Sequence, residues 1–118
     1  MIICIAGSRT IIATSSQISE GLEALGFNPE RDEIISGGAQ GVDMCAAEYC
    51  MDRGITFTEY AADWEKDGRS AGPRRNALMA EDADALLLIW DGVSRGSQNM
   101  RAQMIAMGKK AHEIIVKS

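Results

Sequence analysis

Glycine, serine and arginine recur in four short stretches of the 118-residue chain, and each stretch follows an apolar segment. The stretches are Gly7-Ser8-Arg9, "SGGAQGVD" at 36–43, residues 63–76 and "DGVSRGSQN" at 91–99. Glycine lets backbone N–H groups approach a ligand closely, and the planar arginine fork binds phosphate or carboxylate. These residue types predict an anion site, provided that the fold brings the stretches together.

The arginines are concentrated where such a site would need them. Five of the eight fall in these stretches or in the first turn of the helix that follows, namely Arg9, Arg69, Arg74, Arg75 and Arg95. The chain as a whole carries a formal net charge of −5, which argues against a general nucleic-acid surface and favours a local anion site. The alternative is that the arginines solvate loops or pair with nearby acidic residues.

The stretch "SGGAQGVD" joins an apolar segment to a predicted helix that begins at Val42. Gly37 and Gly38 would expose backbone N–H groups, and the helix would present its positive N-terminal end. "RGS" at 95–97 repeats the arrangement before a later helix. One glycine loop is also explained by a tight turn, but two such loops with arginines between them favour phosphate binding.

Three further side chains in or near these stretches have more than one interpretation. Asp43 either complements the helix dipole or forms a hydrogen bond to a ligand hydroxyl or a neighbouring loop. Trp64 lies in a polar segment, where it is either a wall for base stacking or the anchor of a lid. Trp90 ends an apolar segment and is expected in the core.

The elements that position these residues alternate along the chain. Apolar runs and alternation predict strands at 1–6, 33–36, 55–60, 85–90 and 111–116, with helices at 14–25, 42–53, about 73–82 and 96–107. Thr14 and Gln17 fit a capping box. A long polar loop is expected over residues 62–76, with Pro73 in the first turn of the helix that it enters.

Strand–helix alternation with short connections predicts an α/β fold, a single doubly wound Rossmann-like domain over residues 1–118. Its five-stranded parallel sheet should have helices on both faces. The first and fourth strands are apolar throughout and should be central, whereas the more polar third and fifth should be edges. The predicted strand order is therefore 3-2-1-4-5, with a ligand crevice at the carboxyl ends of the first and fourth strands.

Other features limit the function. Cys4, Cys45 and Cys50 lack metal-like spacing and are expected to be reduced thiols, typical of a cytoplasmic protein. His112 is the single histidine, so we expect neither a metal site nor a cofactor. The sequence shows no signal peptide or membrane span, so no membrane partner is expected.

Two motifs resemble a known superfamily. "SGGAQGVD" is similar to the glycine loop of the DNA-processing protein DprA. Residues 62–100 resemble small stand-alone SLOG proteins related to YpsA, which often occur in phages and mobile elements and share the patterns GGAxGVD and DW…G…AGxxRNxxM…AD. The resemblance spans roughly Gly7 to Gly108. It implies a Rossmann-like fold and a nucleotide or nucleotide-derived ligand.

The superfamily also contains the LOG phosphoribohydrolases, which cleave the N-glycosidic bond of nucleoside monophosphates. Their arginine matches Arg75, with Asn76 in place of the following lysine. Their glycine–threonine pair falls on Gly96-Ser97, and their catalytic glutamate falls on Met100. Because a thioether cannot act as a general acid, LOG-type hydrolysis would need Asp91 or Asp43 as a substitute.

The resulting hypothesis is a nucleotide-binding sensor or sequestering module. Its alternatives are a LOG-like hydrolase with Arg75, Asp91 or Asp43 as catalytic candidates, and DprA-like single-stranded DNA binding, which the net charge disfavours. The stripe of Met100, Met104 and Met107 should pack on the sheet, although homodimers are common in the superfamily. The predicted ligand-binding residues are Gly7, Ser8, Arg9, Ser36, Gly37, Gly38, Ala39, Gly41, Val42, Asp43, Trp64, Arg69, Arg75, Asn76, Asp91, Ser94, Gly96 and Ser97.

Overall fold

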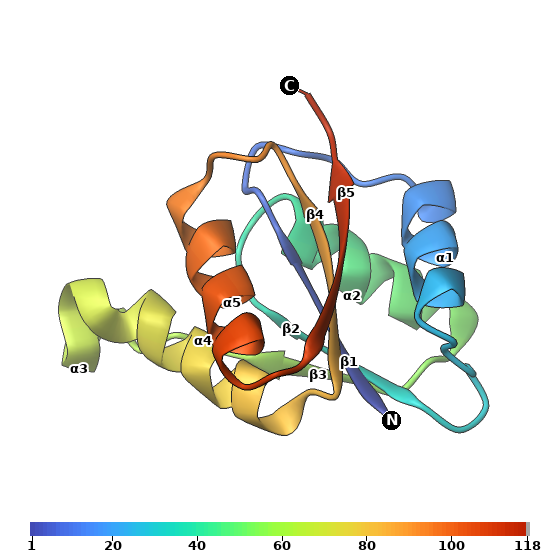
Figure 1. Cartoon of the computed structure of the whole chain (residues 1–118), viewed down its shortest axis with the longest axis horizontal. Coiled ribbons are helices and arrows are strands. Elements are labelled where there is room, and N and C mark those ends of the chain that lie inside the picture. The colour runs from blue at the N-terminus through green and yellow to red at the C-terminus, as the bar shows by residue number, and fades with distance from the viewer. Residues whose placement is uncertain (118) are drawn as a thin grey trace.

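Five parallel strands form one sheet in the order β3-β2-β1-β4-β5 (Figure 1). The computed structural model describes residues 1–117. Its strands are β1 (Ile2–Gly7), β2 (Glu33–Gly37), β3 (Phe57–Tyr60), β4 (Ala85–Trp90) and β5 (Lys110–Ile115). β1 and β4 are central and almost wholly buried. The α/β class, the parallel sheet and the predicted order are thus confirmed.

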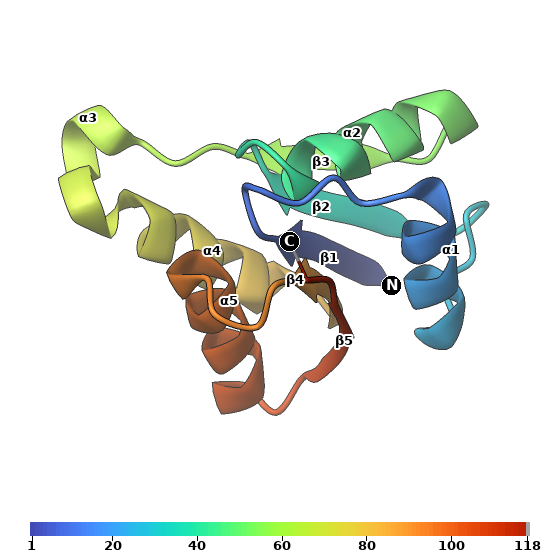
Figure 2. The same cartoon turned by 90° about the horizontal axis from the view of Figure 1, so that it is seen from above.

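Helices cover both faces of this sheet, as Figure 2 shows. One face carries α1 (Ser15–Ala24) and α2 (Val42–Arg53), and the other carries α4 (Ala71–Asp82) and α5 (Arg95–Ala106). Alternate strand residues feed two separate cores, because successive side chains of a strand point to opposite faces. Leu87 joins the core under α1 and α2, whereas Leu88 joins the core under α4 and α5.

Local signals place α1 as predicted. The Gln17 N–H donates to Thr14 Oγ1 at 3.1 Å, and the Thr14 N–H donates to Gln17 Oε1 at 3.0 Å, which completes the capping box. Gly21 lets the helix approach the sheet, since a Cβ there would lie 2.2 Å from a methyl group of Leu87. The helix is therefore fixed by both its cap and its packing.

The prediction of a long polar loop over residues 62–76 is wrong. The segment contains the short helix α3 (Trp64–Asp67), a 3-10 turn (Gly68–Ser70) and the start of α4. Asp63 accepts a hydrogen bond from the Lys66 N–H at 3.1 Å, and the Ser70 hydroxyl donates to the Asp67 carbonyl at 2.7 Å. Polar side chains thus supply local caps that are not visible in hydrophobic periodicity.

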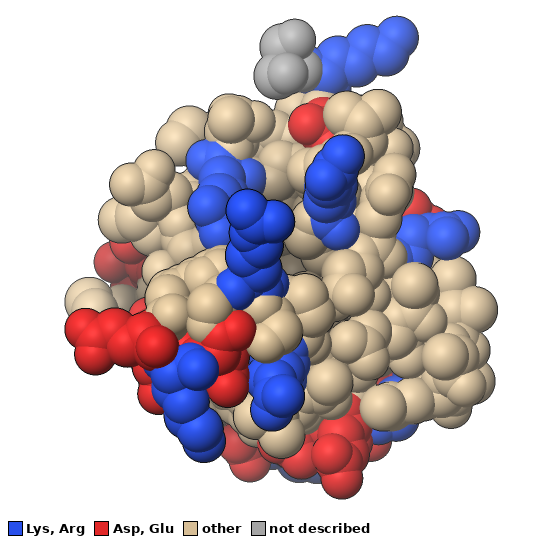
Figure 3. Space-filling model, turned by 90° about the vertical axis from the view of Figure 1, so that its left-hand side faces the viewer, with Lys and Arg blue, Asp and Glu red and all other residues tan. Residues whose placement is uncertain are grey.

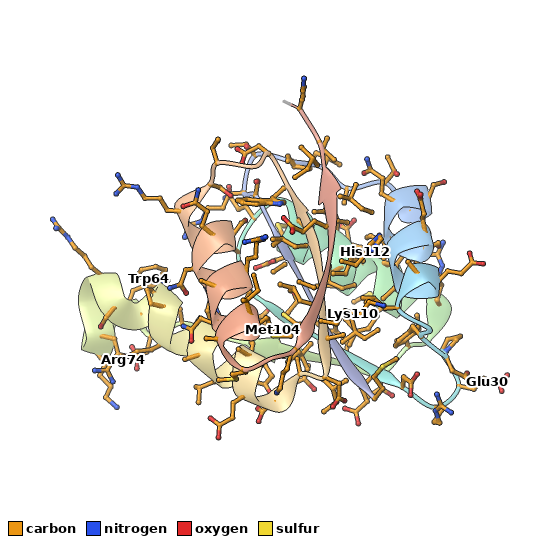
Figure 4. The ribbon with its side chains drawn as sticks, viewed as in Figure 1. Glu30, Trp64, Arg74, Met104, Lys110 and His112 are labelled. Carbon is orange, nitrogen blue, oxygen red and sulfur yellow. The ribbon has the colours of Figure 1, made fainter. Side chains whose placement is uncertain are left out.

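The boundaries of the other elements differ little from the predicted ones. β3 begins at Phe57 rather than at residue 55, because the Ile55 N–H donates to the Cys50 carbonyl at the end of α2 instead of to a neighbouring strand. Met100 and Met104 are buried under α5, whereas Met107 is exposed. Figure 4 shows Met104 on α5 beside the sheet.

The cysteines are all free thiols, of which Cys4 and Cys50 are buried and Cys45 is partly exposed. Burial raises the pKa of the Cys50 thiol to about 11, so this side chain behaves as a small apolar group. Within residues 1–117, every helix is too short or too polar to cross a membrane.

Candidate functional site

A cavity of about 500 Å³ lies at the carboxyl ends of β1 and β4. Its walls come from the loops after β1, β2 and β4 and from the first turns of α4 and α5. This is the crevice expected at the switch point of a doubly wound sheet. Figure 3 views the molecule from the side that α3 occupies and shows basic side chains gathered around the middle of that face, with acidic ones along its lower border.

Two glycines shape the base of this crevice, Gly7 in its lining and Gly41 behind it. A Cβ at Gly7 would lie 1.9 Å from the Ile89 carbonyl oxygen, so the end of β1 can pack against β4 only without a side chain. Gly41 has a φ of 74°, and a Cβ there would lie 2.4 Å from the Ser8 carbonyl oxygen. That carbonyl accepts the Val42 N–H at 3.3 Å. The absence of a side chain at Gly41 therefore lets the loop after β2 pack against the loop after β1.

The N-terminal end of α5 opens into the crevice without a side-chain cap. The first N–H that is used inside the helix belongs to Gln98, which donates to the Ser94 carbonyl at 3.0 Å. Residues 95–97 precede it, and all three line the crevice. The Ser97 hydroxyl is buried and has no hydrogen-bond partner among the described residues. This end of the helix thus offers donors to an anion.

Asp91 and Ser8 fix the loop in front of α5. Asp91 Oδ1 accepts the N–H groups of Val93 and Ser94, each at 2.9 Å, and these bonds hold the pKa of the Asp91 carboxyl below its usual range. The Ser8 hydroxyl accepts the Asp91 N–H at 3.1 Å and lies 3.1 Å from the Ser94 hydroxyl. Asp91 therefore shapes the loop, and its ionised form is already stabilised by backbone donors.

Asp43 is the other carboxylate in the crevice and has the opposite environment. Its side chain lies at the start of α2 with 7 % of the residue exposed. Oδ2 accepts the Ala39 N–H at 3.3 Å, whereas Oδ1 is buried and unpartnered among the described residues. Burial raises the pKa of this carboxyl to about 6, against the lowering effects of the Ala39 bond, of Arg75 and of the Ser36 hydroxyl. The Ser36 hydroxyl lies near the carboxylate but donates its proton to the Ile5 carbonyl at 2.6 Å, which leaves Oδ1 without a partner.

Arg75 reaches the same region from α4. Its Nε donates to Asn76 Oδ1 at 3.1 Å, and its Nη1 donates to the Tyr60 carbonyl at 3.4 Å. A Cβ at Gly37 would lie 2.3 Å from Arg75 Nη1 and 2.9 Å from Asp43 Oδ2. The guanidinium and the carboxylate thus meet at Gly37, although no ion pair joins them among the described residues. Donors of Arg75 remain for a ligand.

Asn76 ties the walls formed by α4 and α5 to each other. Its amide nitrogen donates to the Gly96 carbonyl at 3.3 Å and to Asn99 Oδ1 at 3.1 Å. The residue is buried, so both bonds are shielded from water. Asn76 therefore holds the start of α5 against α4.

The structure brings most of the predicted site residues to the crevice and leaves a few apart. Ser36 donates to the Ile5 carbonyl at 2.6 Å within the core, Val42 is fully buried, and Arg69 is exposed on the 3-10 turn. Gly37 and Gly41 lie behind the lining. The predicted residues that line the crevice are Gly7, Ser8, Arg9, Ala39, Asp43, Trp64, Arg75, Asn76, Asp91, Ser94, Gly96 and Ser97.

A second hollow of about 430 Å³ adjoins the first. The two share Arg9, Ala39, Trp64 and Arg75. Gly38 lines only the second hollow, together with Gln40 and Glu59. Sequence reasoning missed Glu59, since an acidic residue on an edge strand resembles an ordinary solvated one. The site therefore has a larger compartment near α5 and a smaller one near β3.

The arginine cluster divides in two. Arg9, Arg75 and Arg95 line the crevice, whereas Arg74 lies outside it and pairs with Asp67 at 3.8 Å. Figure 4 shows Trp64 beside α3 and Arg74 pointing away from α5. Trp64 is 52 % exposed, and one edge of its ring would contact a Cβ at Gly72 at 3.4 Å. Its remaining ring surface is open to a ligand.

Sequence reasoning also left other crevice residues unassigned. Arg95 was marked by the arginine cluster and Asn99 lies in the same stretch, although neither was among the predicted ligand-binding residues. Thr10, Pro73 and Met79 carry no comparable signal. Within residues 1–117, no group of three or more histidine, cysteine, aspartate or glutamate side chains is placed to hold a metal ion.

Comparison with protein families now gives the family of the chain. The family model described as "YspA, cpYpsA-related SLOG family" matches residues 1–66, which is more than half of the chain. The protein belongs to this SLOG family. The matched part includes β1, the glycine loop after β2 and Asp43, whereas the α4 and α5 walls of this SLOG protein lie beyond it. Searches of curated proteins and of solved structures found no match.

Proposed function

We propose that this SLOG protein binds a phosphorylated nucleotide or nucleotide-derived molecule in the crevice. The supporting observation is the uncapped N-terminal end of α5, where Ser97 keeps a buried hydroxyl without a partner and Arg75 stands nearby on the lining. A buried hydroxyl without a partner is costly in an empty site. A phosphate there would accept hydrogen bonds from this hydroxyl and from the N–H groups of residues 95–97.

The remainder of the ligand has room beside this phosphate position. A volume of about 500 Å³ is within the range of small-molecule sites. Trp64 also lines the crevice and offers an exposed aromatic surface on which a base can stack. Arg9 and Arg95 add positive charge at the entrance. A small sensor or sequestering protein of the reducing cytoplasm fits this site and the three free thiols.

The test is a nucleotide panel with paired variants. Nucleoside mono-, di- and triphosphates should raise the melting temperature of the protein in a concentration-dependent way. Arg75→Met should weaken the best ligand at least about tenfold, because a charge-assisted hydrogen bond is lost. Arg74→Met is the matched control, since Arg74 neighbours Arg75 on α4 but lies outside the crevice. The proposal fails if no phosphorylated ligand stabilises the protein.

A second candidate is hydrolysis of the N-glycosidic bond, and Asp43 is the observation that favours it. A carboxyl whose pKa is raised to about 6 is suited to proton transfer near neutral pH. Met100, at the position of the LOG glutamate, is buried against the crevice and cannot supply a proton. Chromatographic detection of free base, lost in Asp43→Asn, would favour the enzyme. Nucleotide binding without base release would favour the sensor over the hydrolase. Tight, salt-dependent binding of single-stranded DNA, with no binding of nucleotides, would contradict both hypotheses and favour a DNA-binding protein.

A further inference from the structure

Helices α2, α4 and α5 begin at the crevice. α4 is the least suited to an anion, because its Ala71 N–H already donates to the Gly68 carbonyl and Pro73 has no N–H. The other two helices differ in charge. α5 begins with Arg95, Gly96 and Ser97 and has no acidic residue in its first turn. α2 has no side-chain cap either, but Asp43 occupies its first turn. The carboxylate cancels the attraction of that helix end for an anion. A phosphate therefore belongs at α5, and the α2 side of the crevice is left for a group that donates hydrogen bonds.

Asp43 Oδ1 is a strong acceptor that the protein leaves unused. It is one of two buried side-chain polar atoms without a partner among the described residues, and the other is the Ser97 hydroxyl. Both residues line the same crevice, one on α2 and one on α5. An ionised carboxylate accepts hydrogen bonds and donates none. Since buried polar groups are nearly always satisfied, the bound state should bring a donor to Oδ1.

The parts of a nucleotide indicate which donor this is. If the phosphate lies at α5 and the base stacks on Trp64, the sugar would lie between them, in the part of the crevice that Gly7 and Asp43 also line. The donors of the sugar are its hydroxyl groups. Arg75, which lies at Gly37 beside Asp43, brings a positive charge that supports the ionised carboxylate. This part of the crevice is thus arranged for neutral hydroxyls rather than for a second anion.

We propose that a ribose hydroxyl of the ligand donates a hydrogen bond to Asp43 Oδ1, so that the crevice selects ribonucleotides over their deoxy counterparts. This inference rests on the proposed function and specifies its substrate class. A site built to bind a hydroxyl rejects the analogue that lacks it, because the acceptor then stays buried and unpaired. The discrimination should therefore be large and should depend on Asp43.

The first experiment uses ligands that need no knowledge of the base. Ribose 5-phosphate and 2-deoxyribose 5-phosphate are titrated by calorimetry, followed by AMP and GMP with their 2′-deoxy and 3′-deoxy forms. We expect at least one deoxy position to weaken binding about tenfold or more. Equal affinity of all ribo and deoxy forms would overturn the inference while leaving the proposed function intact. If none of these compounds nor any other nucleotide binds, both are overturned.

The second experiment assigns the discrimination to one side chain. In Asp43→Ala, the ratio of ribo to deoxy affinity should fall to about one, while phosphate contacts at α5 keep binding measurable. Asp52→Ala is the matched control, an exposed aspartate at the other end of α2, and should keep the full ratio. If Asp43→Ala does not fold, Asp43→Asn keeps the side-chain volume, and its ratio should also fall. A ratio unchanged in a folded Asp43 variant would overturn the assignment.

Discussion

Two buried aspartates flank β2 and have opposite environments. Asp32 lies just before the strand and Asp43 just after the loop that follows it, and they are 2 % and 7 % exposed. Asp32 accepts hydrogen bonds from Arg31 Nε at 3.0 Å, from the Asn28 N–H at 2.8 Å and from the Met1 ammonium at 3.0 Å, which hold the pKa of its carboxyl below its usual range. Burial without enough donors raises the pKa of Asp43 to about 6.

The difference separates the two ends of the sheet. At the amino ends of the strands, a buried carboxylate is fully partnered and contributes to the stability of the fold. At the carboxyl ends, a carboxylate of similar burial is left partly unpartnered beside an open crevice. Groups of the second kind lower stability in the empty protein and are typical of functional sites. The two aspartates should therefore respond to mutation and to pH in opposite directions.

The largest effect is expected for Asp32→Ala. The change leaves the Asn28 N–H without its partner, which should lower the melting temperature by roughly 10 °C at pH 7. Because the pKa of Asp32 is lowered in the folded state, its contribution is present above about pH 4 and is lost as the pH falls. Thermal melts at pH 7 and pH 3 should show the difference shrinking in acid. A constant difference would contradict this explanation.

Asp43→Asn should have the opposite sign. The folded protein keeps the Asp43 proton up to about pH 6, whereas the unfolded chain loses it near pH 4. Ionisation of Asp43 therefore destabilises the folded protein as the pH rises through this window. The Asn variant cannot ionise, so its free energy of unfolding should exceed that of the wild type by roughly 2 kcal/mol at pH 8 and by little at pH 4. Urea denaturation at both pH values measures this, and destabilisation at pH 8 would show that Asp43 is structural.

Gly37→Ala tests the meeting point of Arg75 and Asp43. The new methyl group would displace the flexible guanidinium, which it would meet at 2.3 Å. Ligand affinity should fall about tenfold while the free energy of unfolding changes little. Gly38→Ala is the comparison variant, since the nearest atoms to its methyl group would belong to the carboxylate of the exposed Glu59 and Gly38 lines only the second hollow. Equal losses in both variants would indicate a general disturbance of the loop.

The smallest effect is expected for Ser97→Ala. The variant loses one hydroxyl donor to the phosphate, so the affinity for phosphorylated ligands should fall about threefold. The melting temperature without ligand should stay level or rise slightly, because an unpartnered buried hydroxyl is removed. Calorimetry with the best nucleotide, paired with thermal melts, measures both. A clear loss of stability without ligand would mean that the hydroxyl already has a structural role.

The fold of this protein follows from local features of its amino-acid sequence. Unbroken apolar runs predict that β1 and β4 are central strands. The capping box of Thr14 and Gln17 marks the start of α1. Handedness and connection rules leave few strand orders, and the polarity of the third and fifth strands, which places them at the edges, then selects the order 3-2-1-4-5 and with it the loops that meet at the crevice. Glycine, serine and arginine in those loops predicted the crevice itself, since composition and loop position are both local properties of the chain.

The partners and the burial of individual side chains depend on the tertiary structure and could not be predicted from the sequence. The sequence could not distinguish Asp32 from Asp43, nor Arg75 from Arg74, because adjacent or chemically identical residues differ only in what surrounds them. The Arg75 guanidinium lies against Gly37, which is distant in the sequence, whereas Arg74 forms an ion pair with the nearby Asp67. Burial, unpaired oxygens and shifted pKa values arise from contacts between distant segments. These contacts, rather than residue types, divide the fold into an end that stabilises it and an end prepared for a ligand.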